Sequence, residues 1–270
     1  MRPRTAGAAR LFASAAVAAL LGLSVAGCKT TGDDVTGSIV ANSAPRSDAD
    51  WRRSLDVWGA RYREKPDDAE AAMGYAQALR ATDQRAQAVS VLQAAALLNP
   101  QNKQLLGAFG RALAEAGDYN QALDVLSRAH TPDNPDWRIL NAQGAVLDQL
   151  GRHAEAQRHY SAALKIVPDD ASILSNLGLS YALTKDLKGA EATLRQAVAR
   201  PDAAPKARQN LALVVGLQGR FAEAETIARA DLPPDEAAAN VSYLRQMLAQ
   251  RGDWSKKNGR HLLPAPDTGT

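Results

Sequence analysis

The tetrapeptide Pro66-Asp67-Asp68-Ala69 recurs in the chain as Pro168-Asp169-Asp170-Ala171, and the two copies are 102 residues apart, which is three times 34. Four columns of similar residues keep the same 34-residue step through five units without an insertion. A fixed period of this length predicts a repeat protein in which each unit packs on the next. The columns are Ala88, Ala122, Ala156, Ala190 and Ala224; Ala76, Gly110, Gly144, Gly178 and Ala212; Leu79, Leu113, Leu147, Tyr181 and Val215; and Leu92, Leu126, Tyr160, Leu194 and Ala228.

The residue types in these columns suit a pair of antiparallel helices. Small residues at the eighth and twentieth positions allow the two helices to approach closely, and larger residues at positions 7, 11 and 24 fill the remaining space. The columns resemble the tetratricopeptide repeat. The resemblance implies an all-α, right-handed superhelical solenoid of helix pairs with repeats at 69–102, 103–136, 137–170, 171–204 and 205–238.

The turn within each pair has a recognisable position. Gly117, Gly151 and Gly219 can adopt the left-handed conformation that ends a helix. Asp83 and Lys185 occupy this position in the first and fourth repeats, so we expect looser turns there. The fifth repeat ends irregularly at residues 231–234, which predicts a short second helix.

The flanking segments extend the same pattern. Trp51, Leu55, Trp58 and Tyr62 recur at helical spacing, which predicts a half repeat at 49–66. A capping helix is predicted at 235–251, with Leu244 and Leu248 facing inward and a turn at 252–254. The solenoid would then span 49–254, and the polar, proline-containing residues 255–270 would form a disordered tail.

The N-terminus carries an export pattern. Three arginines precede an apolar run of about 15 residues, which is too short for a comfortable membrane span. Val25, Ala26 and Gly27 then lead directly into Cys28, the one cysteine of the chain. This stretch resembles the bacterial lipobox, which implies that residues 1–27 are a cleaved signal peptide. The resemblance also implies a covalent S-diacylglycerol and N-acyl lipid on Cys28 as a membrane anchor. The alternative is a free cysteine in a signal anchor.

Residues 28–48 are rich in Thr, Gly, Ser and Asp and lack apolar periodicity, so we expect a flexible tether spanning about 25 Å. Residue 29 is lysine. In enteric lipoproteins an aspartate after the cysteine retains the protein in the inner membrane, so Lys29 favours the outer membrane, with the chain facing the periplasm.

Charge excludes one class of partner. The chain has 32 basic and 29 acidic residues, a formal charge of +3. Residues 1–27 contain three arginines and no acidic residue, so the remaining chain carries equal numbers of each sign. No basic surplus is left to bind nucleic acid. The single cysteine also excludes an internal disulfide framework.

The sequence lacks a recognisable catalytic or metal-binding motif. Its four histidines, His130, His153, His159 and His261, form no metal-ligand pattern, and there is no nucleophile elbow or phosphate-binding loop. The Asp67-Asp68 and Asp169-Asp170 pairs stand where helices begin, which suits capping. We therefore predict no enzyme, no metal or other cofactor, and no small-molecule substrate.

Binding to proteins is the remaining function. The resemblance implies that the first helices line a concave groove, mainly through positions 2, 5, 9, 12 and 13. The early part of this groove is polar and the later part is apolar. An apolar stretch can receive a partner helix or an extended peptide, unless the capping helix covers it through Tyr243 and Met247. The candidate groove residues are Arg111, Arg138, Asn141, Leu179, Leu183, Leu213 and Leu217.

Several longer stretches resemble the TadD family, the tetratricopeptide lipoproteins of the tight-adherence (Flp, or Tad) pilus assembly system. The resemblance implies a pilotin-like adaptor whose partners are the outer-membrane secretin and other Tad components. A lipoprotein adaptor in peptidoglycan synthesis or outer-membrane protein assembly is the alternative. The stretches are Tyr75-Ala76-Gln77-Ala78-Leu79-Arg80, His130-Thr131-Pro132-Asp133-Asn134-Pro135-Asp136-Trp137, Asn176-Leu177-Gly178-Leu179-Ser180-Tyr181-Ala182-Leu183 and Gln209-Asn210-Leu211-Ala212-Leu213-Val214-Val215-Gly216-Leu217-Gln218-Gly219-Arg220.

Overall fold

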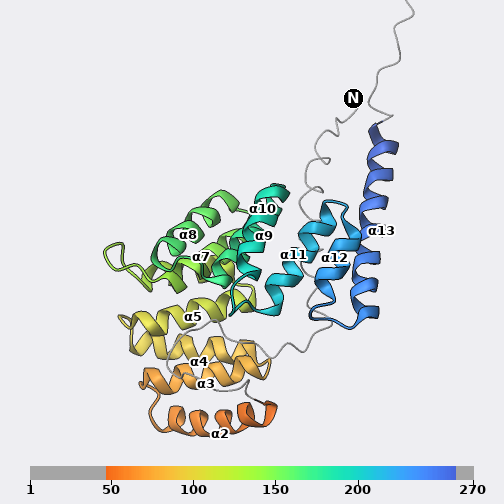
Figure 1. The fold of residues 1–270 in the computed structure, drawn as a ribbon. Helices are drawn as coiled ribbons and strands as arrows, with labels where there is room; N and C mark the ends of the chain where they lie inside the picture. The colour runs from red at the N-terminus through yellow and green to blue at the C-terminus, as the bar shows by residue number, and fades with distance from the viewer. Residues whose placement is uncertain (1–46, 260–270) are drawn as a thin grey trace, which may run out of the picture.

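The computed structural model describes residues 47–259, with side chains described up to residue 250. Helices stack one after another in sequence order within this part, and no strand occurs there (Figure 1). The predicted all-α solenoid is therefore confirmed. The helices are α2 (Asp48–Glu64), α3 (Ala69–Ala81), α4 (Arg85–Leu98), α5 (Lys103–Ala116), α6 (Tyr119–Arg128), α7 (Trp137–Gln149), α8 (His153–Ile166), α9 (Ala171–Leu183), α10 (Leu187–Val198), α11 (Pro205–Leu217), α12 (Phe221–Ala228) and α13 (Pro234–Gly259).

The first helices of the first four repeats begin at polar caps, whereas α11 follows Ala204 and has Pro205 in its first turn. The Asp68 carboxylate accepts backbone hydrogen bonds from Glu70 and Ala71 at the start of α3. Asp170 does the same for α9, and Asn102 and Asp136 cap α5 and α7. These side chains satisfy backbone N–H groups that would otherwise lack partners. The second aspartate of each tetrapeptide, Asp68 or Asp170, is thus a capping residue.

All five turns within the pairs are left-handed, including the two that lack glycine. Asp83 and Lys185 have φ angles of 62° and 68°. The N–H of Gln84 donates to the Leu79 carbonyl at 2.8 Å, as the N–H of Arg152 does to Leu147 in the glycine-containing turn. The prediction of looser turns at Asp83 and Lys185 was therefore wrong. The closing hydrogen bonds hold the same geometry at a strain of about 1 kcal/mol per residue.

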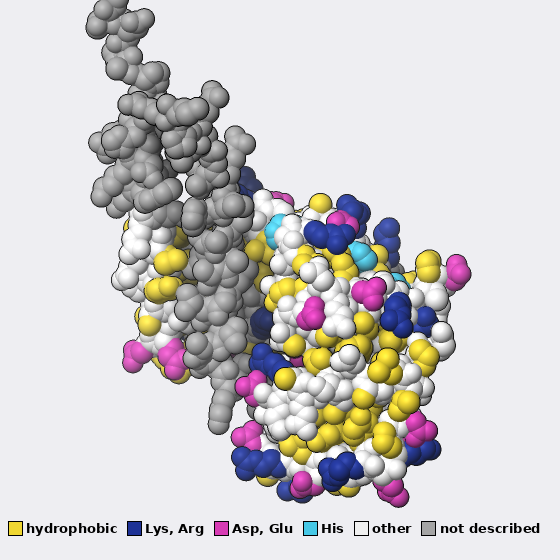
Figure 2. Space-filling view, turned by 180° about the vertical axis from the view of Figure 1, so that it is seen from behind, with side chains coloured by type: hydrophobic (Ala, Val, Ile, Leu, Met, Phe, Trp, Pro, Cys, Tyr) yellow, Lys and Arg dark blue, Asp and Glu magenta, His cyan; other side chains and the backbone are white. Residues whose placement is uncertain are grey.

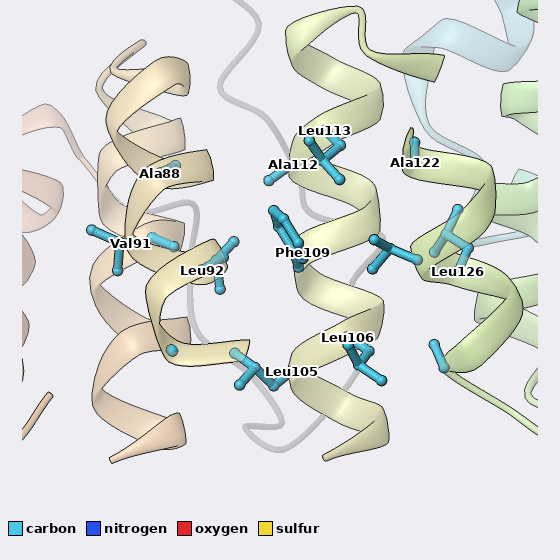
Figure 3. Packing of buried hydrophobic residues seen from close by; sticks show 14 of the residues in the cluster. Ala88, Val91, Leu92, Leu105, Leu106, Phe109, Ala112, Leu113, Ala122 and Leu126 are labelled. Atoms are coloured by element: carbon cyan, nitrogen blue, oxygen red, sulfur yellow. The ribbon is translucent and has the colours of Figure 1, made fainter. Parts of the chain in front are cut away.

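Close approach of the two helices in a pair depends on the small eighth position. A Cβ on Gly110 would lie 2.5 Å from Leu126 Cγ, and one on Gly144 would lie 2.5 Å from Tyr160 Cε1. Leu126 and Ala122 of α6 face α5 in the close view of the core (Figure 3). The large residue at position 24 thus fills the space that glycine leaves.

The two ends of the solenoid differ from each other. Helix α2 covers the start of the stack, where Trp58 packs so closely on Gly74 that a Cβ there would lie 2.5 Å away. Helix α12 has only eight residues, in line with the predicted short helix. At the other end α13 buries Ala237, Val241 and Leu244, whereas Leu248 is only half-buried.

Helix α13 is longer than the sequence indicated. We expected a capping helix at 235–251, a turn at 252–254 and a disordered tail from 255, but the helix continues to Gly259. No proline stands between residue 234 and residue 264. A single glycine costs a helix about 1 kcal/mol and does not by itself end one.

Some predictions lie outside the described residues. They concern the signal peptide at 1–27 with Val25, Ala26, Gly27 and Cys28, the tail from residue 260, and nearly all of the tether at 28–48. The last two tether residues, Ser47 and Asp48, cap and begin α2. Between residues 47 and 259 no helix combines the length and the apolar character that crossing a bilayer requires.

Candidate protein-binding face

The first helices of the repeats contact one another in succession, from α3 through α5, α7 and α9 to α11. We call their shared surface, which carries the seven predicted groove residues, the inner face. All seven side chains are half-buried, so each is part of the surface but is held by neighbours. The seven are Arg111 on α5, Arg138 and Asn141 on α7, Leu179 and Leu183 on α9, and Leu213 and Leu217 on α11.

Polar side chains link successive first helices at a constant sequence offset of 35 residues. Arg80 Nε donates to Glu115 Oε2 at 2.6 Å, joining α3 to α5. Asn176 Nδ2 donates to Asn141 Oδ1 at 3.0 Å, joining α9 to α7. Asn210 Nδ2 donates to Ser175 Oγ at 3.1 Å, joining α11 to α9. These bonds form a partial ladder that joins three of the four successive pairs of first helices.

Sequence reasoning found only part of this ladder. It selected Asn141 but not its partner Asn176, and it missed Ser175 with Asn210. Polar residues occupy the fifth position of the third to fifth repeats and the sixth position of the fourth and fifth, which was the available signal. Their pairing depends on how one repeat is rotated against the next, and the 34-residue period does not contain that rotation.

The basic residues of the inner face already have partners or contacts. The Arg138 guanidinium lies 4.4 Å from the centroid of the Trp137 ring, a cation–π arrangement. Arg111 also interacts with another residue of the protein. Within the described residues, the Nε atoms of both arginines are nevertheless buried without a hydrogen-bond partner.

The apolar half of the inner face consists of Leu179, Leu183, Leu213 and Leu217. None of these leucines belongs to the buried core of the described residues, although their helices are adjacent. The capping helix α13 contacts α11 through Leu244, which lies against Gly216. Tyr243 keeps 48% of its surface exposed. Ala237, Val241 and Leu244 of α13 therefore pack against α11, whereas Tyr243 stays largely exposed and Met247 is half-buried.

Asp148, at a predicted groove position, is a structural residue. Its side chain is 8% exposed. Tyr160 and Ser180 donate hydrogen bonds to it at 3.0 and 2.9 Å, and His153 Nδ1 lies 2.8 Å from Oδ1. Burial, together with the Asp148 charge, raises the pKa of the Tyr160 hydroxyl. Asp148 thus ties α7 to α8 and α9.

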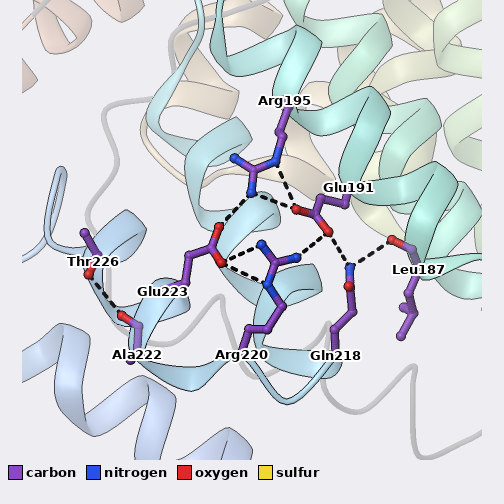
Figure 4. A network of polar contacts seen from close by, with 8 residues as sticks. All are labelled: Leu187, Glu191, Arg195, Gln218, Arg220, Ala222, Glu223 and Thr226. Atoms are coloured by element: carbon purple, nitrogen blue, oxygen red, sulfur yellow. Dashed lines mark hydrogen bonds and ion pairs between the residues drawn. The ribbon is translucent and has the colours of Figure 1, made fainter.

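A second polar cluster joins the last two repeats (Figure 4). Glu191 on α10 accepts hydrogen bonds from Arg195, Arg220 and Gln218 at 2.7 to 3.0 Å. The arginine and amide donors lower the pKa of Glu191 to about 2, with Arg220 as the largest cause. This cluster fixes α10 against the turn between α11 and α12, beside the apolar half of the inner face.

Two of the described histidines lie partly buried beside each other. The Nδ1 atoms of His130 and His159 are buried without a hydrogen-bond partner. Burial lowers the pKa of His159, and the nearby His130 lowers it further. In residues 47–259 no group of three or more His, Cys, Asp and Glu side chains is placed to hold a metal ion.

Comparisons with known proteins agree with this architecture. The tetratricopeptide repeat family model matches residues 138–203. PilW, described as a widely conserved type IV pilus biogenesis factor, superimposes with a TM-score of 0.64 at 15% identity, covering 72% of this chain and 91% of PilW. A chain of the APC/C hetero-tetramer Cut9-Hcn1 gives 0.63 at 15% identity, covering 75% of this chain. Only 40% of that larger chain is spanned. A search of curated proteins gives no match.

Identities this low establish likeness of fold and nothing more. The repeat match, the helix pairs and the two structural neighbours lead to one architecture. The described chain is a solenoid of tetratricopeptide repeats.

Proposed function

We propose that this protein is a lipid-anchored periplasmic scaffold that acts in Flp/Tad pilus assembly, as a pilotin-like adaptor for the outer-membrane secretin. The observation that carries the proposal is the apolar half of the inner face. Four half-buried leucines lie on the adjacent helices α9 and α11, outside the buried core. An apolar surface held by a rigid frame is suited to receive a helix or strand of another protein.

The stretches that resemble the TadD family support the pilus assignment through their location. Residues 176–183 lie on α9, and most of 209–220 lies on α11. These are the two helices that carry the four leucines. The other two stretches, 75–80 and 130–137, lie on α3 and before α7, so the resemblance includes the surface that would bind the partner and extends beyond it. PilW adds a likeness of fold.

The anchor is part of the proposal. Cys28, preceded by Val25, Ala26 and Gly27, has the lipobox pattern, and two or more acyl chains suffice for stable membrane attachment. Replacing Cys28 by Ser should abolish acylation and release the protein from the membrane fraction. A Cys28→Ser protein that remains fully membrane-bound, with no unprocessed precursor, would contradict the anchor.

The alternative function is a lipoprotein adaptor in peptidoglycan synthesis or in outer-membrane protein assembly. The same inner face could serve it, so the partner decides. Membranes cross-linked in cells and purified through this protein should yield the secretin if the pilus assignment is correct. Recovery of a cell-wall synthase or a β-barrel insertion complex, with normal pili after deletion, would establish the alternative.

A matched pair of variants tests the face itself. Leu179→Asp with Leu213→Asp places two charges on the apolar half, and we expect partner recovery to fall by about tenfold or more. Ile166→Asp on α8 is the control, because Ile166 is exposed but lies on a second helix. Unchanged recovery with the folded double variant would reject the inner face as the binding surface.

A further inference from the structure

Two exposed leucines and a cavity with a mixed apolar and polar lining lie together at the second helices of the first two repeats. Leu97 and Leu98, at the end of α4, are 77% and 58% exposed. Leu97 also forms part of the wall of a cavity of about 200 Å³. The rest of its lining includes the apolar Ala96, Leu106, Phe109 and Val125 and the polar Gln93 and Gln121. In the space-filling view hydrophobic side chains gather over the lower part of the molecule (Figure 2). Helices α2, α3 and α4 lie in this part (Figure 1).

The surroundings of this feature are unusually poor in charge. From residue 86 to residue 102 the chain has no ionisable side chain, and this stretch contains nearly all of α4. The cavity is bordered instead by Asp124 and Arg128, one turn apart on α6. Both are exposed, and neither forms an ion pair within residues 47–250. Lys103 adds a second cation beside Arg128, because its Nζ donates to the Arg128 carbonyl at 2.7 Å. The face therefore combines the Asp124 carboxylate with the Arg128 and Lys103 cations beside an uncharged helix.

We propose that this face, formed by α4 and α6, is the interface of a two-fold symmetric homodimer. A two-fold contact requires a self-complementary surface, in which residue i of one copy meets residue j of the other and the reverse. Here Leu97 of each copy would enter the cavity of the other copy. With α6 antiparallel to its symmetry mate, Arg128 of each copy would face Asp124 of the other. The uncharged α4 introduces no like-charge repulsion across the axis.

The proposal is independent of the inner face. The dimer would use the second helices α4 and α6, whereas the four leucines of the inner face lie on the first helices α9 and α11. Dimerisation would therefore leave both inner faces available. Two linked copies would present two binding surfaces to an assembled, multi-subunit partner, which increases avidity without any new contact.

The repeat pattern supplies a substitution that preserves the fold. Lys165 occupies in the third repeat the position that Leu97 occupies in the first, because the two are two periods apart. Helix α8 accommodates this lysine at its exposed end. Leu97→Lys therefore introduces a residue that the same helix position already tolerates. Ile166→Lys, at the repeat position of Leu98, is the matched control on α8.

Sedimentation equilibrium of the full chain tests the dimer, with Cys28→Ser in every sample so that lipid cannot drive association. We expect a dimer that Leu97→Lys weakens by about tenfold or more and that Ile166→Lys leaves unchanged. Circular dichroism melting identifies any variant that fails to fold. A monomeric parent chain, or equal effects of the two lysine variants, would overturn the proposal, even if another protein were found on this face.

A charge exchange tests the geometry of the contact. Asp124→Arg or Arg128→Asp alone should each weaken the dimer, because two like charges would meet across the axis. The double variant exchanges the signs and should restore the dissociation constant to within a factor of about two. If the double variant is as weak as the single ones, the antiparallel pairing of α6 is wrong and the proposed interface is rejected.

Discussion

At the scale of single residues, His159 links the stability of the third repeat to pH. Burial and the neighbouring His130 lower its pKa below the ordinary value of 6.5. Glu155 acts in the opposite direction, and Arg158 and Arg152 act in the same direction as His130. Because the unfolded chain binds the proton more readily, the free energy of unfolding should fall as the pH drops through 6.5.

His159→Gln removes this contribution, since glutamine does not titrate. Urea unfolding at pH 7 and pH 5 should show a smaller loss of stability for the variant than for the parent chain. His261→Gln, beyond the residues that the structure describes, provides the comparison for the loss of a histidine as such. The same pH dependence in the His159→Gln variant and the parent would contradict this role.

Gly144 shows how one missing methyl group determines helix packing. A Cβ at this position would lie 2.5 Å from the Tyr160 ring, and the ring is fully buried. We expect Gly144→Ala to destabilise the protein by about 1–3 kcal/mol, although alanine is the better helix former. Gly151→Asp is the contrasting variant, because Asp83 already occupies that turn position in the first repeat with φ of 62°. Chemical denaturation that ranks Gly151→Asp as the more damaging would refute the packing argument.

At the scale of elements, the Glu191 cluster makes α10 and the α11–α12 turn a single unit. The pKa of Glu191 is lowered from 4.5 to about 2. The stabilisation is therefore complete above pH 4.5 and is lost as the pH falls towards 2. Glu191→Gln should cost about 1 kcal/mol at pH 7 and should flatten the pH dependence in this window.

Glu225→Gln is the matched control for this cluster. Glu225 contacts only Arg229, one turn away on a helix surface, and such pairs contribute less than about 0.5 kcal/mol. Thermal unfolding at pH 7 should therefore separate the two variants. Equal losses would show that Glu191 is no more important than an ordinary surface carboxylate.

The elements also show what a sequence period can predict. The positions of α3 to α11 follow from the columns, because the small and large residues repeat with the pairs they build. The turns at Asp83 and Lys185 were predicted wrongly, since residue type suggested strain and the closing backbone hydrogen bonds overcome it. The end of α13 was predicted wrongly as well, because no neighbouring repeat limits its length. The Asn141–Asn176 and Ser175–Asn210 bonds depend on rotation between repeats, which the period does not encode.

At the scale of the whole molecule, the solenoid separates two surfaces with different chemistry. Each helix contacts mainly its neighbours along the chain, so a substitution on one repeat should leave distant repeats unchanged. The apolar half of the inner face lies on α9 and α11, in the fourth and fifth repeats. The exposed Leu97 and Leu98 lie on α4, the second helix of the first repeat. Partner binding and self-association can therefore be altered one at a time.

The central claim is that the apolar half of the inner face contacts the pilus machinery, and site-specific photo-cross-linking in cells measures this contact directly. A photoreactive amino acid would replace Leu213 on α11 in one strain and Ile166 on α8 in another. The account predicts a covalent adduct with the secretin from position 213 and none from position 166. Equal adducts at the two positions, or an adduct from position 213 with a cell-wall synthase in place of the secretin, would contradict it.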